Sequence, residues 1–309
     1  MKIGILASER SWYYRDLDRA AKSRGHLCER LDFARLAARV NSVSATIRHI
    51  PCVAPEKIPS PGQRDGLQAD LACDLAEFDL ILVRTMPPGS LEQVVYRMDV
   101  LARLQAAGTR VVNSPKALEC AVDKYLTTAR LQAAGLPVPE TIVCEHEDDA
   151  MEAFDQLGHD VVVKPLFGSE GRGIVRVTDP DLAHRTFRTL MRLNAVLYLQ
   201  RFVDHGGCDV RILVLDGQVL GGMRRRSPDD FRTNVARKAV AELHEPTAGE
   251  IDLALRAALT TEAFIAGVDL LYDRDGTGYV IEVNAVPGWQ AFGRVTGIDV
   301  ATMLINRVG

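Results

Sequence analysis

Apolar and polar positions at the start of the chain follow the order strand, helix, strand. Residues 2–8 form a short apolar run typical of a buried strand, and Ser11–Arg24 carries apolar residues at helical spacing before Gly25. A second strand is predicted at Leu27–Phe33, which completes a βαβ opening. Three further elements are predicted in this domain, namely a strand at Phe78–Val83, a helix at Leu91–Ala107 and a strand at Arg110–Asn113. This order predicts a parallel α/β architecture.

Residues 51–70, rich in proline, glycine and charge, are predicted to form an irregular crossover inside the first domain. After this domain, the pattern changes from parallel α/β to a smaller α+β pattern. Ser114 can then cap a helix that has Pro115 in its first turn and stops at Gly135. A helix lies between the first two of the three strands predicted after it, at Thr141–Cys144, Val161–Pro165 and Ile174–Val177.

Hairpin signals dominate from Leu197 onward. Asp-Gly pairs at 216–217 and 275–276 each lie beside apolar runs, as in tight antiparallel turns. The strands predicted beside these turns are Arg211–Leu215, Val219–Met223 and Tyr279–Val283, and a closing helix is predicted at Gly297–Val308. We therefore predict three domains, at residues 1–112, 113–195 and 196–309.

Composition supports a globular protein with no general affinity for polyanions. Of the 309 residues 47% are hydrophobic and 25% are charged, and 37 basic against 41 acidic residues give a net charge of -4. This balance gives no electrostatic reason to expect nucleic acid or an anionic membrane as the main partner. The sequence also lacks an apolar signal segment and a run of about 18 apolar residues, so we predict a cytoplasmic location.

The six cysteines do not form a recognisable site in the sequence. They are Cys28, Cys52, Cys73, Cys120, Cys144 and Cys208. Without a CxxC pair or a nearby histidine, they do not indicate zinc or redox chemistry. We interpret them as reduced and structural, with a catalytic thiol as the alternative.

The strongest local motif is VVVKPLFGSEGRGIVRV at residues 161–177, where an apolar strand delivers Lys164 to a glycine-rich turn. Gly168, Gly171 and Gly173 permit positive φ angles and close backbone approach, so successive N–H groups can face phosphate oxygens. The alternative is a plain hairpin with a solvated lysine. Neither GxxxxGK[ST] nor GxGxxG before a helix is present, which disfavours a P-loop or a Rossmann site.

Carboxylate and amide side chains interrupt two apolar strands near the end of the chain. GVDLLY at 267–272 carries Asp269, and YVIEVNAVPG at 279–288 carries Glu282 and Asn284 on one strand face. Oxygen ligands without histidine or cysteine suit Mg²⁺ or Mn²⁺. The alternative, a solvated strand face, is disfavoured because unpaired carboxylates in apolar strands are costly.

A group of basic side chains is the third candidate site. Planar guanidinium groups can neutralise a transferring phosphoryl group, although a charge run is more often a solvated face. We expect catalytic roles for Arg211, Arg224, Arg232 and Asn234. The residues expected to face solvent are Arg225, Arg226, Arg237 and Lys238.

Taken together, these stretches resemble the ATP-grasp superfamily and, within it, the RimK-like amino-acid ligases. The matching landmarks, in order, are MKIGIL, DK…GLPVPET, VVVKP with GSEGRG, LYLQRFV, GGCDVRILV, MRRR…DFRTN, GVDLL, EVNAVPG and TGIDVA. The resemblance covers nearly the whole chain. It implies an N-terminal parallel α/β pre-ATP-grasp domain followed by two α+β lobes that enclose ATP.

The resemblance also implies roles for individual residues. Lys124, which alone would be an ordinary helix lysine, and Lys164 would hold ATP phosphates. The full implied nucleotide set is Lys124, Lys164, Gly168, Ser169, Glu170, Gly171, Gly173, Gln200, Arg201, Phe202, Val203, Asp209, Arg232, Thr233 and Asn234. The implied ligands of two magnesium or manganese ions are Asp269, Glu282 and Asn284. Arg201 departs from the family, which usually has glutamate at this position of the adenine hinge.

The implied activity is an ATP-dependent carboxylate–amine ligation through an acyl phosphate. Glutamate or another amino acid would be added to a small cofactor or a peptide. LYLQRFV, VPGW and VTGIDVA are closer to the relatives associated with tetrahydromethanopterin biosynthesis. Members often form a homodimer or homotetramer, so the resemblance implies one of these. The alternatives are a D-alanine–D-alanine-type or purine-pathway ligase, a non-catalytic ATP-binding module, and a Rossmann oxidoreductase, which the missing GxGxxG disfavours.

Overall fold

A four-stranded parallel sheet forms the centre of the first of two units in the computed structural model, which describes residues 1–42, 44–50, 73–168, 171–227, 230–233 and 239–309. This unit consists of Met1–Pro115 together with Asp299–Gly309. Its sheet has the strand order β2-β1-β6-β7, and all neighbouring pairs are parallel. The main elements are β1 (Lys2–Leu6), α1 (Trp12–Lys22), β2 (Leu27–Leu31), β6 (Leu80–Val83), α3 (Leu91–Ala106), β7 (Arg110–Val112) and α10 (Val300–Val308). The predicted βαβ opening is confirmed.

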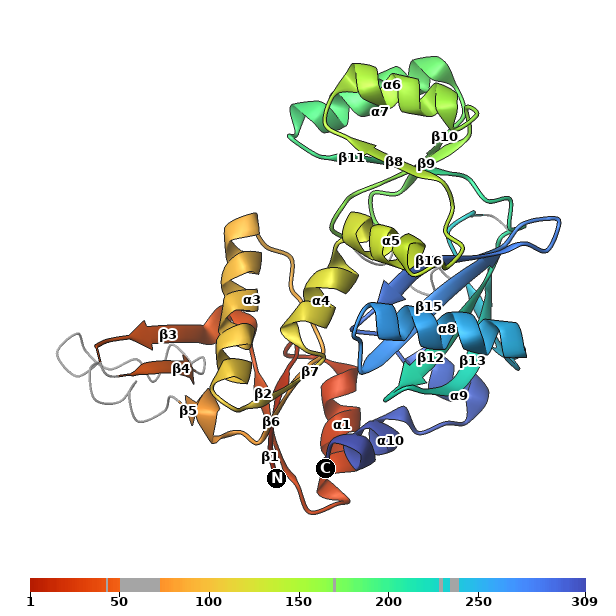
Figure 1. Ribbon diagram of the computed structural model, residues 1–309. Coiled ribbons are helices and arrows are strands. Elements are labelled where there is room, and N and C mark those ends of the chain that lie inside the picture. The colour runs from red at the N-terminus through yellow and green to blue at the C-terminus, as the bar shows by residue number, and fades with distance from the viewer. Residues whose placement is uncertain (43, 51–72, 169–170, 228–229, 234–238) are drawn as a thin grey trace. The chain divides into compact units, whose positions relative to one another are not determined.

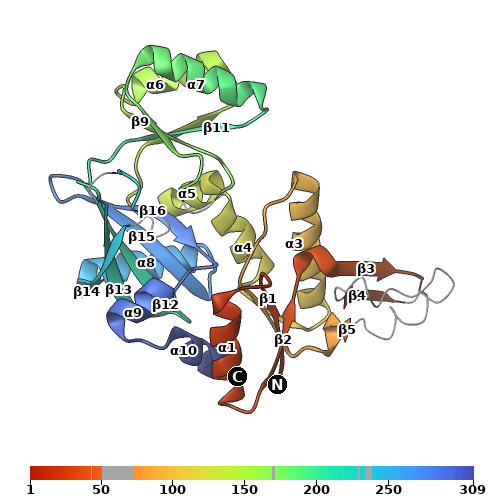
Figure 2. The same ribbon diagram turned by 180° about the vertical axis from the view of Figure 1, so that it is seen from behind.

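The helices of this unit cover both faces of the parallel sheet. The crossover from β1 through α1 leads outward to β2, whereas the crossover from β6 through α3 leads in the opposite direction to β7. Because such crossovers are right-handed, α1 and α3 lie on opposite faces, as Figure 2 shows. The last helix, α10, packs against α1. Its buried side chains include Leu304 and Ile305.

A small antiparallel sheet beside the parallel sheet was not predicted. It has the order β3-β4-β5. Its strands and the adjoining turns are η1 (Phe33–Arg35), β3 (Leu36–Val40), β4 (Ala45–His49), β5 (Cys73–Asp74) and η4 (Leu75–Glu77). The predicted crossover at residues 51–70 lies outside the described residues, as do Cys52, Ser169, Glu170, Asn234, Arg237 and Lys238.

The second unit is Lys116–Ile298. Where we predicted a single helix at its start, the structure has two short helices. These are α4 (Pro115–Val122) and α5 (Lys124–Ala133). The two helices are separated at Asp123. Its backbone is extended, and its side chain accepts from the Leu126 N–H and so caps α5. Aspartate competes for backbone N–H groups in this way, which favours the start of a helix over its interior. The break makes Lys124 the first residue of α5.

A four-stranded antiparallel sheet follows, with the order β10-β9-β11-β8. The elements are β8 (Thr141–Cys144), α6 (Glu147–Gln156), β9 (Val161–Lys164), β10 (Val175–Val177), α7 (Pro180–Arg192) and β11 (Leu197–Arg201). A core that includes Phe154, Phe187, Val163 and Leu199 joins α6 and α7 to this sheet. Helix α7 was not predicted, although the capping side chain of Asp179 precedes it.

A five-stranded antiparallel sheet completes the second unit (Figure 1), and its strand order is β14-β13-β12-β15-β16. Its elements are β12 (Cys208–Leu215), β13 (Gln218–Arg226), β14 (Val240–His244), α8 (Ala248–Thr260), β15 (Ile265–Tyr272), β16 (Gly278–Asn284) and α9 (Gln290–Thr296). The predicted Asp216-Gly217 turn is confirmed, and both residues have positive φ, 49° and 68°. Helix α8 was not predicted, although Thr247 and Glu250 form a capping box at its start.

The observed units group the ends of the chain differently from the predicted three domains. Residues 299–309 belong to the same unit as residues 1–115, whereas we had placed them in a domain that begins at 196. The boundaries at 112 and 195 stay predictions. Among the described residues, no helix is both long and apolar enough to cross a membrane.

Candidate active site

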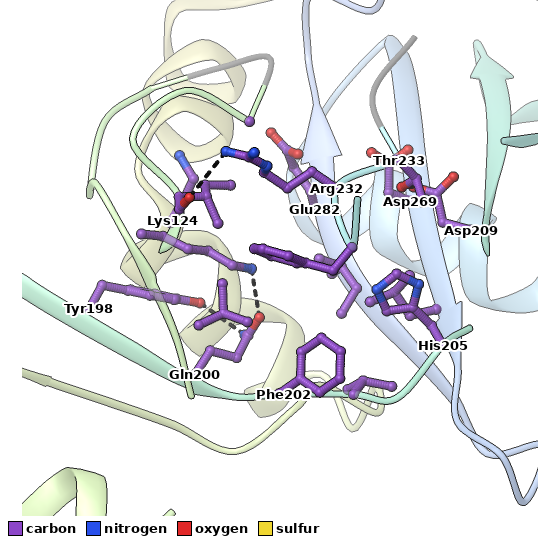
Figure 3. Close-up of a pocket in the computed structure, with 18 of the residues that line it drawn as sticks. Lys124, Tyr198, Gln200, Phe202, His205, Asp209, Arg232, Thr233, Asp269 and Glu282 are labelled. Atoms are coloured by element: carbon purple, nitrogen blue, oxygen red, sulfur yellow. Dashed lines mark hydrogen bonds between the residues drawn. The ribbon is translucent and has the colours of Figure 1, made fainter. Parts of the chain in front are cut away.

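One pocket in the second unit gathers most of the predicted site residues (Figure 3). Those that line it are Lys124, Lys164, Gly168, Gly171, Gln200, Arg201, Phe202, Val203, Asp209, Arg232, Thr233, Asp269 and Glu282. They come from the two antiparallel sheets of the second unit, the start of α5 and the loops that connect these elements. Four described candidates are not among the lining residues, namely Gly173, Arg211, Arg224 and Asn284.

Lys164 lies at the end of β9 and extends into this pocket. Its ammonium donates to Gln200 Oε1 at 2.6 Å, and Gln200 in turn donates to Thr141 Oγ1 at 2.9 Å and to the Tyr198 hydroxyl at 3.1 Å. Burial lowers the pKa of Lys164 to about 8, against the opposing effect of Glu282. The lysine is thus held by neutral partners, and an anion in the pocket would favour its charged form.

Lys124 is placed beside the glycine-rich loop by the helix break before it. Its ammonium donates to the Gly168 carbonyl oxygen at 2.8 Å. Burial lowers the pKa of Lys124, and the carboxylate of Glu282 opposes this effect. The loop closes back on its own strand at Gly173, where φ is 72° and an added Cβ would lie 2.8 Å from Pro165 Cγ. A side chain at this position would therefore disturb the loop.

Two carboxylates and two guanidinium groups form a buried chain along β12, β13 and β15. Arg211 donates two bonds of 2.6 Å to Asp269, which stands opposite it in the neighbouring strand. Arg225 Nη2 lies 2.9 Å from Asp269 Oδ2, which also accepts from Arg211, and the Arg225 guanidinium makes two bonds to Asp209. Thr233 donates to Asp209 as well. Cross-strand register thus explains how each charge finds a partner of opposite sign.

The pKa values of the two carboxylates of this chain shift in opposite directions. Burial alone would raise the pKa of Asp269, but Arg211 and Arg225 together lower it below its usual range. Asp209 is paired with one guanidinium, and burial raises its pKa overall. Both carboxylates raise the pKa of Arg225 despite its burial. Asp269 is therefore anionic at neutral pH, with both carboxylate oxygens paired to guanidinium groups.

The expectation for two neighbouring arginines was wrong. Arg225, which we expected to face solvent, is 2% exposed and lines the pocket. Arg224, which we expected to act in the site, points to the other face of β13, where its Nη2 lies 3.4 Å from His244 Nδ1. Successive residues of a strand point to opposite faces, so only one of the two can reach the pocket.

The predicted metal ligands lie on two paired strands. Asp269 and Glu282 are direct partners in the register of β15 and β16. Asn284 is two residues further along β16, and its Oδ1 accepts from the Val286 N–H at 2.9 Å. The negative charge of Glu282 acts to raise the pKa values of both lysines of the pocket, Lys124 and Lys164. An oxygen-only donor set beside two ammonium groups fits a magnesium-bound polyphosphate.

Arg232 reaches across the pocket toward β10 (Figure 3). Its guanidinium pairs with Asp230 at 2.8 Å, and Nη1 lies 3.4 Å from the Ile174 carbonyl oxygen. The Phe231 ring lies 5.6 Å from the same guanidinium. The arginine is only partly buried, so its donors can be redirected to an anion without loss of a core contact.

Several further residues that line the pocket, most of them aromatic or apolar, were not predicted from the sequence. They are Val162, Arg172, Ile174, Tyr198, His205, Phe231, Leu271 and Ile281, in addition to Arg225. Tyr198 could have been found, because it lies two residues before Gln200 on the same face of β11. Phe202 and Phe231 form an edge-to-face pair with ring centres 6.2 Å apart. Such an apolar slot next to cations is suited to a nucleotide base.

Family models match both parts of the chain. The model of the RimK-like ATP-grasp domain matches residues 121–308, and the N-terminal domain of prokaryotic glutathione synthetase matches residues 16–119. Tetrahydromethanopterin:alpha-L-glutamate ligase of Methanosarcina acetivorans is 28% identical over 334 residues, which span 99% of this chain and 98% of that protein. Ribosomal protein bS6--L-glutamate ligase of Escherichia coli O7:K1 is 30% identical over 310 residues, which span 99% and 95% of the two chains.

Solved structures share the fold. The ATP-grasp ligase PsnB, in complex with a minimal precursor, Mg and ADP, superposes with a TM-score of 0.69 at 21% identity. The match covers 99% of this chain and 96% of that structure. At this identity the likeness concerns the fold, which is the α/β arrangement predicted from the sequence.

Proposed function

We propose, because this chain belongs to the family defined by the RimK-like ATP-grasp domain, that it adds glutamate to the carboxylate of a small cofactor or a peptide at the expense of ATP. The chain is an ATP-grasp ligase that forms carbon–nitrogen bonds. The observation that carries the finer proposal is the pocket in which Lys124, Lys164 and Arg232 face Asp269 and Glu282. Such a pocket suits phosphoryl transfer from a metal-bound nucleotide.

In the proposed reaction the acceptor carboxylate attacks the terminal phosphorus of ATP, and the bond to ADP breaks. Lys124, Lys164 and Arg232 would bind and orient the phosphate oxygens, and their charges would offset the negative charge that grows during transfer. The amino group of glutamate then attacks the acyl phosphate, phosphate leaves, and the amine loses its proton. Arg211 would orient the acyl group, because its guanidinium is bound to Asp269, one of the proposed metal ligands. No side-chain nucleophile is required.

Asp269 and Glu282 would hold magnesium, with Asn284 as a further ligand, and two ions are part of the proposal. Magnesium would supply charge neutralisation between the phosphate groups. The aromatic residues Phe202 and Phe231 would hold the base, with the hinge residues Gln200 to Val203. Arg201 is exposed and contributes its backbone N–H to Glu140 rather than to the slot, so its side chain can replace glutamate without blocking the base.

The nature of the acceptor rests on the relatives. One is named for tetrahydromethanopterin and the other for a ribosomal protein, and both are named for glutamate. We propose a cofactor-type carboxylate such as a pterin first and a peptide second, because VPGW and VTGIDVA favour the first group. A homodimer or homotetramer is part of the proposal and can be tested by light scattering of the purified chain.

The test is release of ADP by the purified chain with magnesium, ATP, glutamate and a panel of pterin, deazaflavin and peptide acceptors. We expect ADP only when the acceptor and glutamate are both present, with a product heavier than the acceptor by one glutamate residue. Tight ATP binding without turnover on any acceptor would instead support a non-catalytic module.

A matched pair of variants tests the assignment of the pocket. Glu282→Gln should lower the rate of ADP release by roughly 100-fold or more, because charge offset in the transition state is lost. Glu262→Gln, an exposed residue outside the pocket, should leave the rate unchanged. Full activity in the Glu282 variant would sink the assignment of the metal site.

A further inference from the structure

In the first unit, three side chains of the kinds that bind metal ions lie close together. Glu29 of β2, His49 of β4 and Cys73 of β5 offer ligand atoms that all lie within 4.8 Å of one another. Cys73 Sγ is 3.4 Å from Glu29 Oε1. Two ligands of a tetrahedral ion with bonds of about 2.0–2.3 Å are separated by roughly 3.5 Å. We call these three residues the β2–β4–β5 cluster.

The β2–β4–β5 cluster lies where two sheets meet. β2 is the edge strand of the parallel sheet, whereas β4 and β5 are neighbours in the antiparallel sheet. His49 and Cys73 are direct partners in the register of these two strands. His49 is 5% exposed, and the other two side chains are half-buried. Strand pairing therefore holds His49 beside Cys73, and the hydrogen bond from Cys73 to Glu29 joins β2 to them.

The surroundings do not favour a reactive thiol at Cys73. Burial and the carboxylate of Glu29 raise the pKa of Cys73 to about 11, so the thiol is protonated and donates to that carboxylate. The Asp32 N–H lies 3.1 Å from His49 Nε2, which occupies the ring's lone pair. His49 therefore does not act as the base for the thiol. A nucleophilic role is excluded by these two contacts.

Charged neighbours are compatible with a cation at this position. Lys2 lies close enough to influence Cys73, but its ammonium is paired with Glu77 at 2.9 Å. Arg30, Asp32 and Arg35 also act on His49 electrostatically, and burial lowers the pKa of His49. The imidazole is thus neutral at pH 7, which is the form that binds a metal.

We propose that Glu29, His49 and Cys73 bind one zinc ion, with water in the fourth position. A thiolate, an imidazole and a carboxylate are all zinc ligands, whereas magnesium prefers oxygen donors alone. Binding releases the thiol proton of Cys73 to solvent and breaks its bond to Glu29. The metal takes the His49 lone pair in place of the Asp32 N–H, so one neutral hydrogen bond is exchanged for a coordinate bond.

The zinc ion would fasten the edge of the parallel sheet to the antiparallel sheet. Coordination would join β2 to β5, whose residues are far apart in the sequence, and so would stabilise the first unit against unfolding. The three ligands are separate from the pocket of the second unit, and this proposal holds whether or not the proposed ligase reaction is correct.

The experiment uses the full chain, purified under reducing conditions and freed of metal with a chelator. Zinc is titrated in saturating magnesium, which fills the oxygen-donor site, and a chromophoric chelator reports the affinity. We expect one zinc per chain. Cobalt should give the near-ultraviolet absorption of a thiolate–cobalt bond. In Cys73→Ser and His49→Ala the affinity should fall at least about tenfold, and the serine variant should lose this absorption.

Cys28→Ser is the matched control, because Cys28 precedes Glu29 on β2 and faces the charged residues Asp18 and Lys22 of α1. Its zinc affinity should equal that of the unchanged chain. Zinc should raise the unfolding temperature of the unchanged chain but not of Cys73→Ser, and the two should unfold alike without metal. Unchanged zinc affinity in the Cys73 variant, or cobalt binding without thiolate absorption, would overturn the proposal.

Discussion

The ammonium of Lys164 gives the pocket a distinctive response to pH. Its pKa of about 8 lies below the ordinary value of 10.5, because burial disfavours the charge. In the interval between these two values the unfolded lysine keeps its proton while the folded lysine loses it. The unfolded state then binds more protons, so this lysine makes the folded chain more stable as the pH rises through the interval.

Lys164→Met should remove this contribution. Relative to the variant, the unchanged chain should gain about 1–3 kcal/mol of unfolding free energy between about pH 7.5 and about pH 10. Lys22→Met, which changes an exposed lysine of α1, should show no such trend. Urea unfolding across this pH range measures both differences, and parallel curves for the unchanged chain and the Lys164 variant would contradict the prediction.

Arg225 holds two buried carboxylates at once. Arg225→Met should cost about 3–5 kcal/mol of unfolding free energy, because Asp209 and part of Asp269 lose their counter-charge inside the protein. Arg226→Met, at the exposed neighbouring position, should change stability by about 0.5 kcal/mol or less. Equal losses in the two variants by chemical unfolding would show that the ion pairs do not stabilise the fold.

We predicted that Arg224 acts in the site, but Arg225 lines the pocket instead. The reason lies in the pairing of β12 with β13. Counted back from the Asp216-Gly217 turn, Asp209 should stand opposite Arg224. A β-bulge between Leu213 and Val214 shifts the register by one residue, so Arg225 takes that place. A shift of one residue moves each side chain to the other face. The oxygen donors Asp269 and Glu282 were predictable because they are unusual in apolar strands, whereas the bulge has no comparable signal.

At the scale of elements, the break between α4 and α5 is what brings Lys124 to the loop. Asp123→Ala removes the cap of α5 and should cost about 1 kcal/mol of stability. Because Lys124 follows directly, ATP should also bind about tenfold more weakly, which corresponds to the loss of one ammonium contact.

Asp179→Ala serves as the control for this prediction. Asp179 caps α7 in the same way, through the Leu182 N–H, but α7 contributes no residue to the pocket lining. It should cost similar stability and leave ATP affinity unchanged. Calorimetric titration with ATP and thermal unfolding separate the two effects. Equal ATP affinities in both variants would mean that the cap does not position Lys124.

Elements with strong local signals were predicted better than elements that depend on partners. The Asp216-Gly217 turn and the helix predicted at Ser11–Arg24 carry strong local signals, and both are confirmed. Helix α8 carried a capping box that we overlooked. The sheet β3-β4-β5 could not be predicted from local pattern, because β5 has only two residues and is defined by its pairing with β4.

At the scale of the whole molecule, α10 belongs to a unit that otherwise ends at residue 115. Leu304 is 1% exposed on this helix. Leu304→Ala should cost about 2–5 kcal/mol through lost burial and a cavity. Hydrogen exchange should increase in peptides of β1 and α1 and stay unchanged in β12 and β15. Increased exchange in the five-stranded sheet would contradict a division of the chain into these two units.

The late position of α10 has a consequence for biosynthesis. A ribosome makes residues 116–298 before it makes the helix that packs against α1. Domains tend to fold as units while the chain emerges, and exposed apolar surface attracts chaperones. The second unit can therefore fold first, while the apolar side of α1 stays exposed until α10 has been made. A purified chain that ends at residue 298 should accordingly resist protease in the second unit and remain sensitive in α1.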